Sequence, residues 1–234
     1  MKKKQIIIML CILVVPLTFG VLEFLGVIWH TDIFARGYEI KGLDVSNHQH
    51  IIEWYNVSSE DYKFVFMKAT EGEDFVDKSF EINWKGAKDN KFLVGAYHFF
   101  VTSSTGEEQA NNFIRTVPVE SDSLPPVIDL EVNKRENKEM VVKNLEVMID
   151  RLEEIYGKKP IIYVTYDTYN AFVKGSFQEC DIWIRDIMKL PRLEDEQKWV
   201  FWQYCNRGRI EGIDTYVDIN VFHGTEKELI ELTK

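Results

Sequence analysis

The sequence lacks the signatures of several common enzyme and binding classes. It has no G-x-S-x-G element, no histidine pair with H-x-x-x-H spacing and no glycine-rich loop of the kind that holds phosphate. It also has no internal repeat. These absences argue against a serine hydrolase, a zinc hydrolase, a nucleotide-binding enzyme and a repeat protein.

Positive charge is scarce relative to negative charge. The 234 residues include 28 Lys and Arg against 38 Asp and Glu, which gives a formal net charge of −10. Nucleic-acid binding depends on clustered Lys and Arg, and no basic stripe is present, so the sequence argues against a nucleic-acid partner. A neutral sugar suits this balance better than a polyanion as the substrate.

One long apolar run stands at the amino terminus. Three lysines at positions 2–4 precede it, and residues 6–22 carry no charge. At ~1.5 Å rise per residue this run approaches the ~30 Å of a bilayer core, and the lysines favour a cytoplasmic amino end. We therefore expect a single-pass signal-anchor or transmembrane helix over residues 1–30, a short linker over 31–39 and one extracytoplasmic domain over 40–234. A cleaved signal peptide, and hence a secreted protein, is the alternative.

Apolar runs rich in β-branched and aromatic residues recur along the domain, with helical patterns between them. The expected helices cover residues 78–91, a segment that begins with a capping box at Thr105 and Glu108, residues 137–156 and residues 168–174. The eight expected strands cover residues 40–45, 62–69, 93–100, 126–131, 160–165, 181–187, 199–204 and 216–222.

Strand–helix alternation implies parallel strands, and eight strands suggest a closed barrel. The last three strands have no amphipathic helices between them. The expected fold class is therefore α/β: an irregular (β/α) barrel with five strand–helix units followed by three strands, preceded by one N-terminal transmembrane helix. An open doubly wound sheet is the alternative.

Acidic side chains gather at the ends of these strands, where barrel enzymes keep their active sites. Asp44 ends the first strand, Asp129 and Glu131 end the fourth, and Asp218 lies in the eighth, which closes next to the first. The spacing of Asp129 and Glu131 points both to one face. Any one acid could be a cap or an ion-pair partner, but four together predict a catalytic cluster. Crowding raises the pKa of at least one carboxyl, which then stays protonated as a general acid.

Aromatic residues in the same strands support a sugar site, because flat rings stack on pyranose faces. We expect Tyr97 and Trp202 to contact the substrate, since they adjoin the polar residues His98 and Gln203. Tyr163 is a further candidate, although an aromatic residue in a strand more often belongs to the core. We expect no cofactor and no bound metal, and a divalent metal ion held by the acids is the chemical alternative.

Six motifs follow one another along the domain, and together they resemble the glycoside hydrolase family 25 lysozymes, which are N-acetylmuramidases. Each motif alone is weak, whereas six in this order are specific, and the resemblance covers about residues 40–224. The motifs are KGLDVSNHQ at 41–49, FVFMKATEG at 64–72, GAYHFF at 95–100, PVIDLE at 126–131, FWQY at 201–204 and VDIN at 217–220.

The resemblance implies the same irregular barrel and cleavage of the β-1,4 bond between N-acetylmuramic acid and N-acetylglucosamine in peptidoglycan strands. It implies Glu131 as the proton donor to the leaving oxygen and Asp129 as the residue that orients the 2-acetamido group of the substrate. The other implied site residues are Asp44, Asp218, Tyr97 and Gln203.

Two carboxyls on alternate residues of one strand have Cβ atoms ~7 Å apart. That separation leaves little room for the separate water molecule of a simple inverting glycosidase. We therefore expect substrate assistance, in which the acetamido oxygen attacks the anomeric carbon.

The sequence departs from the family pattern in two places. His50 stands where the family often has Gly, and the sixth strand reads WIRDI, so that Arg185 and Asp186 change the rim of the site. Two other functions stay open at this point. One is a catalytically weak, membrane-anchored glycan-binding module, and the other is a related barrel hydrolase that acts on chitin-like glycans.

A final expectation concerns Cys180 and Cys205. The link between the strands at 181–187 and 199–204 is short for a helical crossover, so a hairpin is plausible there. If Ile187 faces Lys198 in that hairpin, the two cysteines face each other at a separation that suits a disulfide. Two buried free thiols are the alternative, and a parallel pair of strands would place the cysteines at opposite ends.

Overall fold

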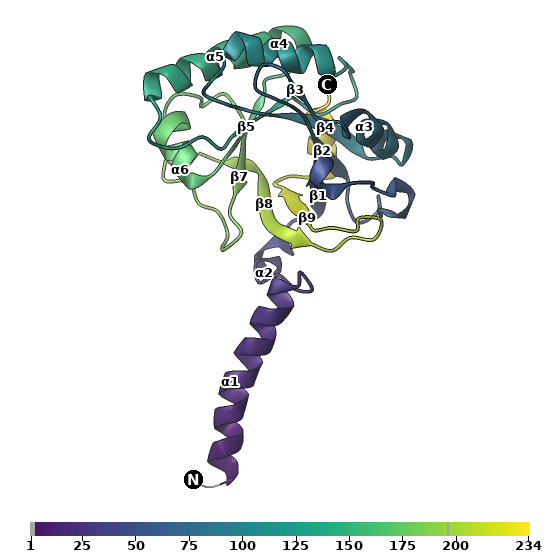
Figure 1. Ribbon diagram of the computed structural model, residues 1–234, viewed down its shortest axis with the longest axis vertical. Helices are drawn as coiled ribbons and strands as arrows, with labels where there is room; N and C mark the ends of the chain where they lie inside the picture. The colour runs from purple at the N-terminus through teal and green to yellow at the C-terminus, as the bar shows by residue number, and fades with distance from the viewer. Residues whose placement is uncertain (1–2, 196) are drawn as a thin grey trace.

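The computed structural model describes residues 3–195 and 197–234, apart from the side chains of residues 6–10. Within these residues one sheet has the strand order β1-β9-β8-β7-β6-β5-β4-β2-β3, and an additional pairing of β1 with β2 closes it into a barrel (Figure 1). The expected closed barrel is confirmed, and the open sheet is wrong. The strands are β1 (Ile40–Val45), β2 (Phe64–Glu71), β3 (Phe75–Val76), β4 (Leu93–Phe99), β5 (Val127–Leu130), β6 (Ile161–Val164), β7 (Ile182–Arg185), β8 (Trp199–Gly208) and β9 (Val217–Phe222).

Strand direction is uniform around the barrel except at one strand. From β1 through β2, β4, β5, β6, β7 and β8, neighbouring strands run parallel. The last strand, β9, runs antiparallel to both β8 and β1. The short β3 is not part of the ring and forms an antiparallel hairpin with β2. All eight expected strands are therefore present, and the irregularity lies in the direction of β9.

Helices fill most of the expected strand-to-strand connections. The first connection differs, because two 3-10 turns take the place of an α-helix between β1 and β2. The helices are α1 (Lys3–Phe24), α2 (Asp32–Ala35), α3 (Phe80–Asp89), α4 (Gly106–Thr116), α5 (Lys138–Tyr156), α6 (Tyr166–Thr168) and α7 (Glu226–Glu231). The shorter helical turns are η1 (Asn47–Gln49), η2 (Trp54–Asn56) and the π-helical η3 (Tyr169–Val173).

Local sequence explains where the two longest barrel helices begin and end. The Thr105 hydroxyl accepts from the Glu108 amide, and the Glu108 carboxylate accepts from the Thr105 amide, which confirms the capping box of α4. Asn137 caps α5 by accepting from the Met140 amide. Gly157 ends α5 in the left-handed conformation, at a φ of 66°, which glycine adopts at low cost.

Aromatic rings packed edge to face fill the inside of the barrel. Phe64, Phe66 and Phe201 are fully buried, and their ring centroids lie 5.1–5.8 Å apart. Two inward-facing glycines make room for them: a Cβ at Gly42 would lie 2.4 Å from the Phe64 ring, and one at Gly95 would lie 2.3 Å from the Phe66 ring. Because these rings fill the barrel interior, no ligand can enter it. The space for a ligand lies at the carboxyl ends of the parallel strands.

The structure does not support the expected transmembrane helix over residues 1–30. The helix α1 projects away from the barrel (Figure 1). In the part of the chain that the structure describes, no helix combines the length and the apolar character needed to cross a membrane.

The hairpin expected between the sixth and seventh strands is wrong. These strands, β7 and β8, run parallel, with Ile182 opposite Trp199. Cys180 precedes the start of β7, whereas Cys205 lies in the second half of β8, so the two residues lie toward opposite ends of the strand pair. Both are buried free thiols.

We expect thiol accessibility to reflect this arrangement. Burial raises the pKa of Cys180 and of Cys205 to about 12, so both should resist a thiolate-directed reagent in the folded protein. A disulfide-exchange dye should therefore label only the exposed Cys11 in native protein and all three cysteines after denaturation. A linked Cys180–Cys205 peptide in a non-reducing digest would contradict this arrangement.

Candidate active site

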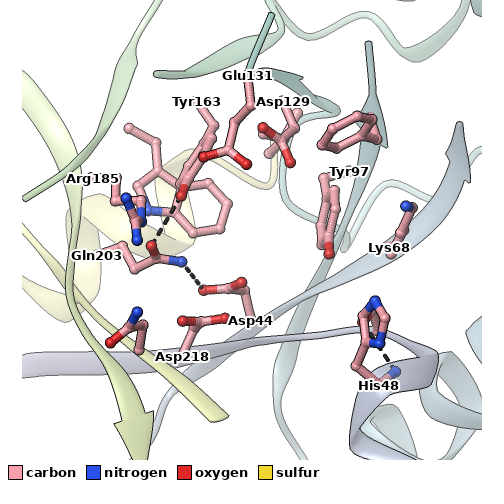
Figure 2. Close-up of a pocket in the computed structure, with 15 residues that line it drawn as sticks. Asp44, His48, Lys68, Tyr97, Asp129, Glu131, Tyr163, Arg185, Gln203 and Asp218 are labelled. Carbon is pink, nitrogen blue, oxygen red and sulfur yellow. Dashed lines mark hydrogen bonds between the residues drawn. The ribbon is translucent and has the colours of Figure 1, made fainter. Parts of the chain in front are cut away.

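An open cavity of about 460 Å³ lies at the carboxyl ends of the parallel strands (Figure 2). This volume is within the range of small-molecule sites. Seven of the eight residues predicted from the sequence line it, and the structure therefore brings them together. They are Asp44, Tyr97, Asp129, Glu131, Tyr163, Gln203 and Asp218.

Strand geometry explains how two distant acids meet. Successive residues of a strand point to opposite faces, so in β1 Leu43 packs in the outer core while Asp44 points into the barrel. In β9 the same alternation turns Asp218 inward and Ile219 outward. Asp44 and Asp218 are direct partners in the antiparallel pair of β1 and β9. The sequence prediction that the eighth expected strand closes beside the first is confirmed.

A chain of hydrogen bonds fixes Asp44. Its Oδ2 atom accepts from Asn220 Nδ2 at 2.7 Å and from Gln203 Nε2 at 3.0 Å. Trp183 Nε1 donates to the Asn220 amide oxygen at 2.9 Å, and the Tyr163 hydroxyl donates to the Gln203 amide oxygen at 2.9 Å. Both amide groups are therefore oriented with their NH₂ groups toward Asp44, which is held as an acceptor.

Burial raises the pKa of three of the acids in the cavity, Asp44, Asp129 and Asp218. Desolvation raises the pKa of Asp44 to about 6; Glu131 adds to the rise, and the two amide hydrogen bonds oppose it. Desolvation also raises the pKa of Asp129 well above its usual range, with further increases from Glu131 and Asp44. The pKa of Asp218 is raised well above its usual range by burial and then by Asp44. The cluster can therefore carry protons at a pH at which exposed carboxyls have lost theirs.

Asp129 and Glu131 occupy contrasting environments at the end of β5. Asp129 is buried, and its Oδ1 atom has no hydrogen-bond partner among the described residues. Glu131 follows the last residue of β5 and is exposed to solvent at the cavity (Figure 2). A buried polar atom without a partner is costly, so Asp129 is suited to meet a polar group of a ligand. Glu131 is suited to exchange protons with a ligand or water.

The structure excludes Trp202 from the cavity. It follows Phe201 and precedes Gln203 on β8, and since Gln203 points inward, Trp202 must point outward. Its ring is fully buried in the outer core, and its Nε1 atom donates to the Asp186 carbonyl at 2.7 Å. The aromatic wall of the cavity includes Trp183 instead.

Three residues at or beside the cavity were not among the predicted site residues, although Arg185 was expected to change the rim of the site. Asn220 holds Asp44, and the alternation in VDIN could have found it, because Asn220 lies two residues after Asp218 on the same face. Lys68 lines the cavity and pairs with Glu71 at 2.6 Å. Arg185 also lines the cavity. No local pattern in the sequence shows that either cation reaches the acids.

His98 is not part of the cavity lining, whereas His48 is. His98 is fully buried, with Nδ1 2.7 Å from Thr70 Oγ1 and Nε2 3.1 Å from Gln109 Oε1, and burial lowers its pKa to about 4. Its contacts are those of a structural residue. Among the described residues, no group of three or more His, Cys, Asp or Glu side chains is arranged to hold a metal ion.

Comparison with known proteins relates this cavity to an enzyme family. Residues 43–213 match the profile of Glycosyl hydrolases family 25. The chain is similar to the structure of a family 25 glycosyl hydrolase from Bacillus anthracis, with 48% identity and a TM-score of 0.79 over 83% of this chain and 94% of that one.

Two curated proteins are also similar over most of the chain. Lysozyme M1 of Streptomyces globisporus is 28% identical, and the match covers 82% of this chain and 71% of that protein. The uncharacterized protein YegX of Escherichia coli strain K12 is 36% identical over 82% of this chain and 72% of its own length.

Proposed function

This chain belongs to the glycosyl hydrolases of family 25 and is a glycoside hydrolase of the muramidase type, and from that premise we propose the bond it cleaves and the residues that cleave it. The proposed substrate is peptidoglycan, and the proposed bond is the β-1,4 link between N-acetylmuramic acid and N-acetylglucosamine. Because this polymer lies outside the cytoplasmic membrane, the domain would act there. The observation that carries the proposal is the pairing of a buried Asp129 with an accessible Glu131 in one acidic cavity.

Glu131 is the proposed general acid. Its side chain is exposed at the cavity, so it can reach a glycosidic oxygen and later accept a proton from water. As the bond from the anomeric carbon to the leaving oxygen breaks, the proton of Glu131 passes to that oxygen. The resulting carboxylate then takes a proton from the water molecule that completes hydrolysis.

Asp129 is the proposed partner of the substrate's acetamido group. Its unpartnered Oδ1 atom can accept a hydrogen bond from the amide N–H, which turns the amide oxygen toward the anomeric carbon. That oxygen forms the new bond as the glycosidic bond breaks, in the substrate-assisted manner known for some glycosidases. Asp44 and Asp218 contribute negative charge near the developing cation when they are ionised.

Product analysis tests the proposed bond. Purified peptidoglycan treated with the protein should yield fragments with muramic acid at the reducing end, which reduction and mass spectrometry identify. Fragments with glucosamine at the reducing end would assign a different bond. Binding without fragments would support a catalytically weak glycan-binding module, and cleavage of chitin oligomers in preference to muramyl glycan would support a chitin-directed hydrolase.

Substrate assistance also predicts how the cleavage rate depends on the acetyl group of muramic acid. Glycan that lacks the acetyl group on muramic acid has no amide oxygen to attack the anomeric carbon, so we expect it to be cut at least ~100-fold more slowly than acetylated glycan. Re-acetylation of the same strands provides the control and should restore the rate. Equal rates on the two glycans would instead indicate attack by a protein carboxylate or by an activated water molecule.

A further inference from the structure

Arg185 is the cation of the cavity that has no described partner. It is the last residue of β7, it is half-buried, and it lies beside Tyr163 and Gln203 (Figure 2). Lys68, on the other side of the cavity, is engaged with Glu71 and with the rings of Phe75 and Phe99. Among the described residues, by contrast, the Arg185 guanidinium has no hydrogen bond or ion pair. Its donors are available to a ligand.

The backbone that carries Arg185 is held firmly. The next residue, Asp186, is buried and accepts from the amides of Met188 and Lys189 at 2.9 and 3.0 Å, and from the Tyr166 hydroxyl at 3.0 Å. The Asp186 amide also donates to the Gln203 carbonyl at 3.1 Å. Arg185 therefore projects from a fixed point at the cavity wall, which reduces the entropy lost when it binds a ligand.

The neighbouring acids do not occupy the hydrogen-bond donors of Arg185. Desolvation raises the pKa of both Asp44 and Asp218, and the positive charge of Arg185 acts against that rise from a distance. Asp44 already accepts hydrogen bonds from two amides, so its position does not depend on Arg185. A guanidinium binds a carboxylate through two parallel hydrogen bonds, and this geometry is its strongest recognition mode.

We propose that Arg185 binds the lactyl carboxyl group of a muramic acid residue in the cavity, an inference that rests on the proposed function. N-acetylglucosamine carries a hydroxyl group at that position and offers no carboxyl. When a stem peptide is attached, the lactyl group ends in an amide, whose carbonyl oxygen accepts without a charge. When the peptide has been removed, the lactyl group is a carboxylate that takes both guanidinium hydrogen bonds. The enzyme thus prefers glycan strands stripped of their peptides.

The test compares two substrates made from the same glycan. Peptide-bearing strands and strands stripped by an amidase are offered to the wild-type protein and to Arg185→Gln, Arg185→Lys and the control Arg192→Gln. Arg192 is exposed and lies outside the cavity. For each protein, kcat/KM on both substrates is measured from release of reducing-end muramic acid across a pH series.

We expect wild type and Arg192→Gln to prefer stripped strands by at least ~10-fold, since hydrogen bonds to charged groups are the stronger class. Arg185→Gln should bring that ratio close to one, and Arg185→Lys should keep part of it. If Arg185 only adjusts the acids, Arg185→Gln will shift the pH profile and lower both rates equally, and an unchanged ratio overturns the inference. Failure of every protein to release reducing-end muramic acid would instead refute the proposed function.

Discussion

Glu131→Gln is expected to lower kcat on peptidoglycan by at least ~100-fold, the lower end of the contribution of general acid catalysis. The substitution removes the proton that passes to the leaving oxygen and keeps the size of the side chain. Because Glu131 is exposed at the cavity and is not part of the hydrogen-bond chain around Asp44, the fold and the affinity for glycan should be preserved. Reducing-end release measures turnover, and sedimentation with insoluble peptidoglycan measures binding.

The matched control is Glu146→Gln. Glu146 is exposed on α5, remote in sequence from the strand ends, and does not line the cavity. It should keep wild-type turnover. If Glu131→Gln also keeps most of its turnover, Glu131 is not the acid, and the proton must come from another carboxyl of the cluster.

Asp129→Asn is expected to lower turnover by about 100-fold or more while raising the thermal stability of the protein at neutral pH. The loss of turnover follows from a misoriented acetamido group and is of the size seen when one preorganised catalytic hydrogen bond is removed. The gain in stability follows from burial, because Asn never has to ionise. Removing a destabilising active-site charge is worth about 0.5–2 kcal/mol, or a few degrees in melting temperature.

The sign of the pH dependence separates this effect from simple repacking. Burial raises the pKa of Asp129 in the folded protein above the ~3.9 of an unfolded chain, so the folded state favours the neutral carboxyl. This carboxyl costs nothing below about pH 4 and costs progressively more as the pH rises toward its folded pKa. The melting temperature of Asp129→Asn should thus match wild type near pH 4 and exceed it increasingly as the pH rises above about 4.

Scanning calorimetry over this pH series provides the measurement, with Asp150→Asn as the control. Asp150 is exposed on α5. Its substitution should shift melting temperature little at any pH. A difference between Asp129→Asn and wild type that stays constant with pH would mean that ionisation of Asp129 does not limit stability.

Periodic patterns explain why much of this site could be predicted. The eight apolar runs gave the strands, and the strand ends gave the acids at 44, 129 and 218. Asp129 and Glu131 could be placed together because residues two apart on a strand share a face. The same rule, applied from Gln203, would have placed Trp202 outside the cavity. That error came from treating proximity in sequence as proximity in space.

Features that depend on tertiary placement could not be predicted in the same way. The direction of β8 relative to β7 depends on how the segment between them crosses the barrel, and its length alone suggested a hairpin. The absence of an Arg185 partner is equally invisible in sequence, because it depends on where every acid of the cavity points. The unusual WIRDI segment indicated that Arg185 lies at the rim, but it did not show that the side chain points into the cavity.

The alternation of polar and apolar side chains in β9 limits the insertions and deletions that this barrel can tolerate. Asp218 and Asn220 face the cavity, whereas Val217, Ile219 and Val221 face the apolar layer outside the barrel. Removing one residue within β9 would exchange the two faces, placing an aliphatic side chain opposite Asp44 and a carboxyl in the outer core. Changes of length in related chains should therefore avoid this strand, and Asp44 and Asp218 should be inherited as a pair.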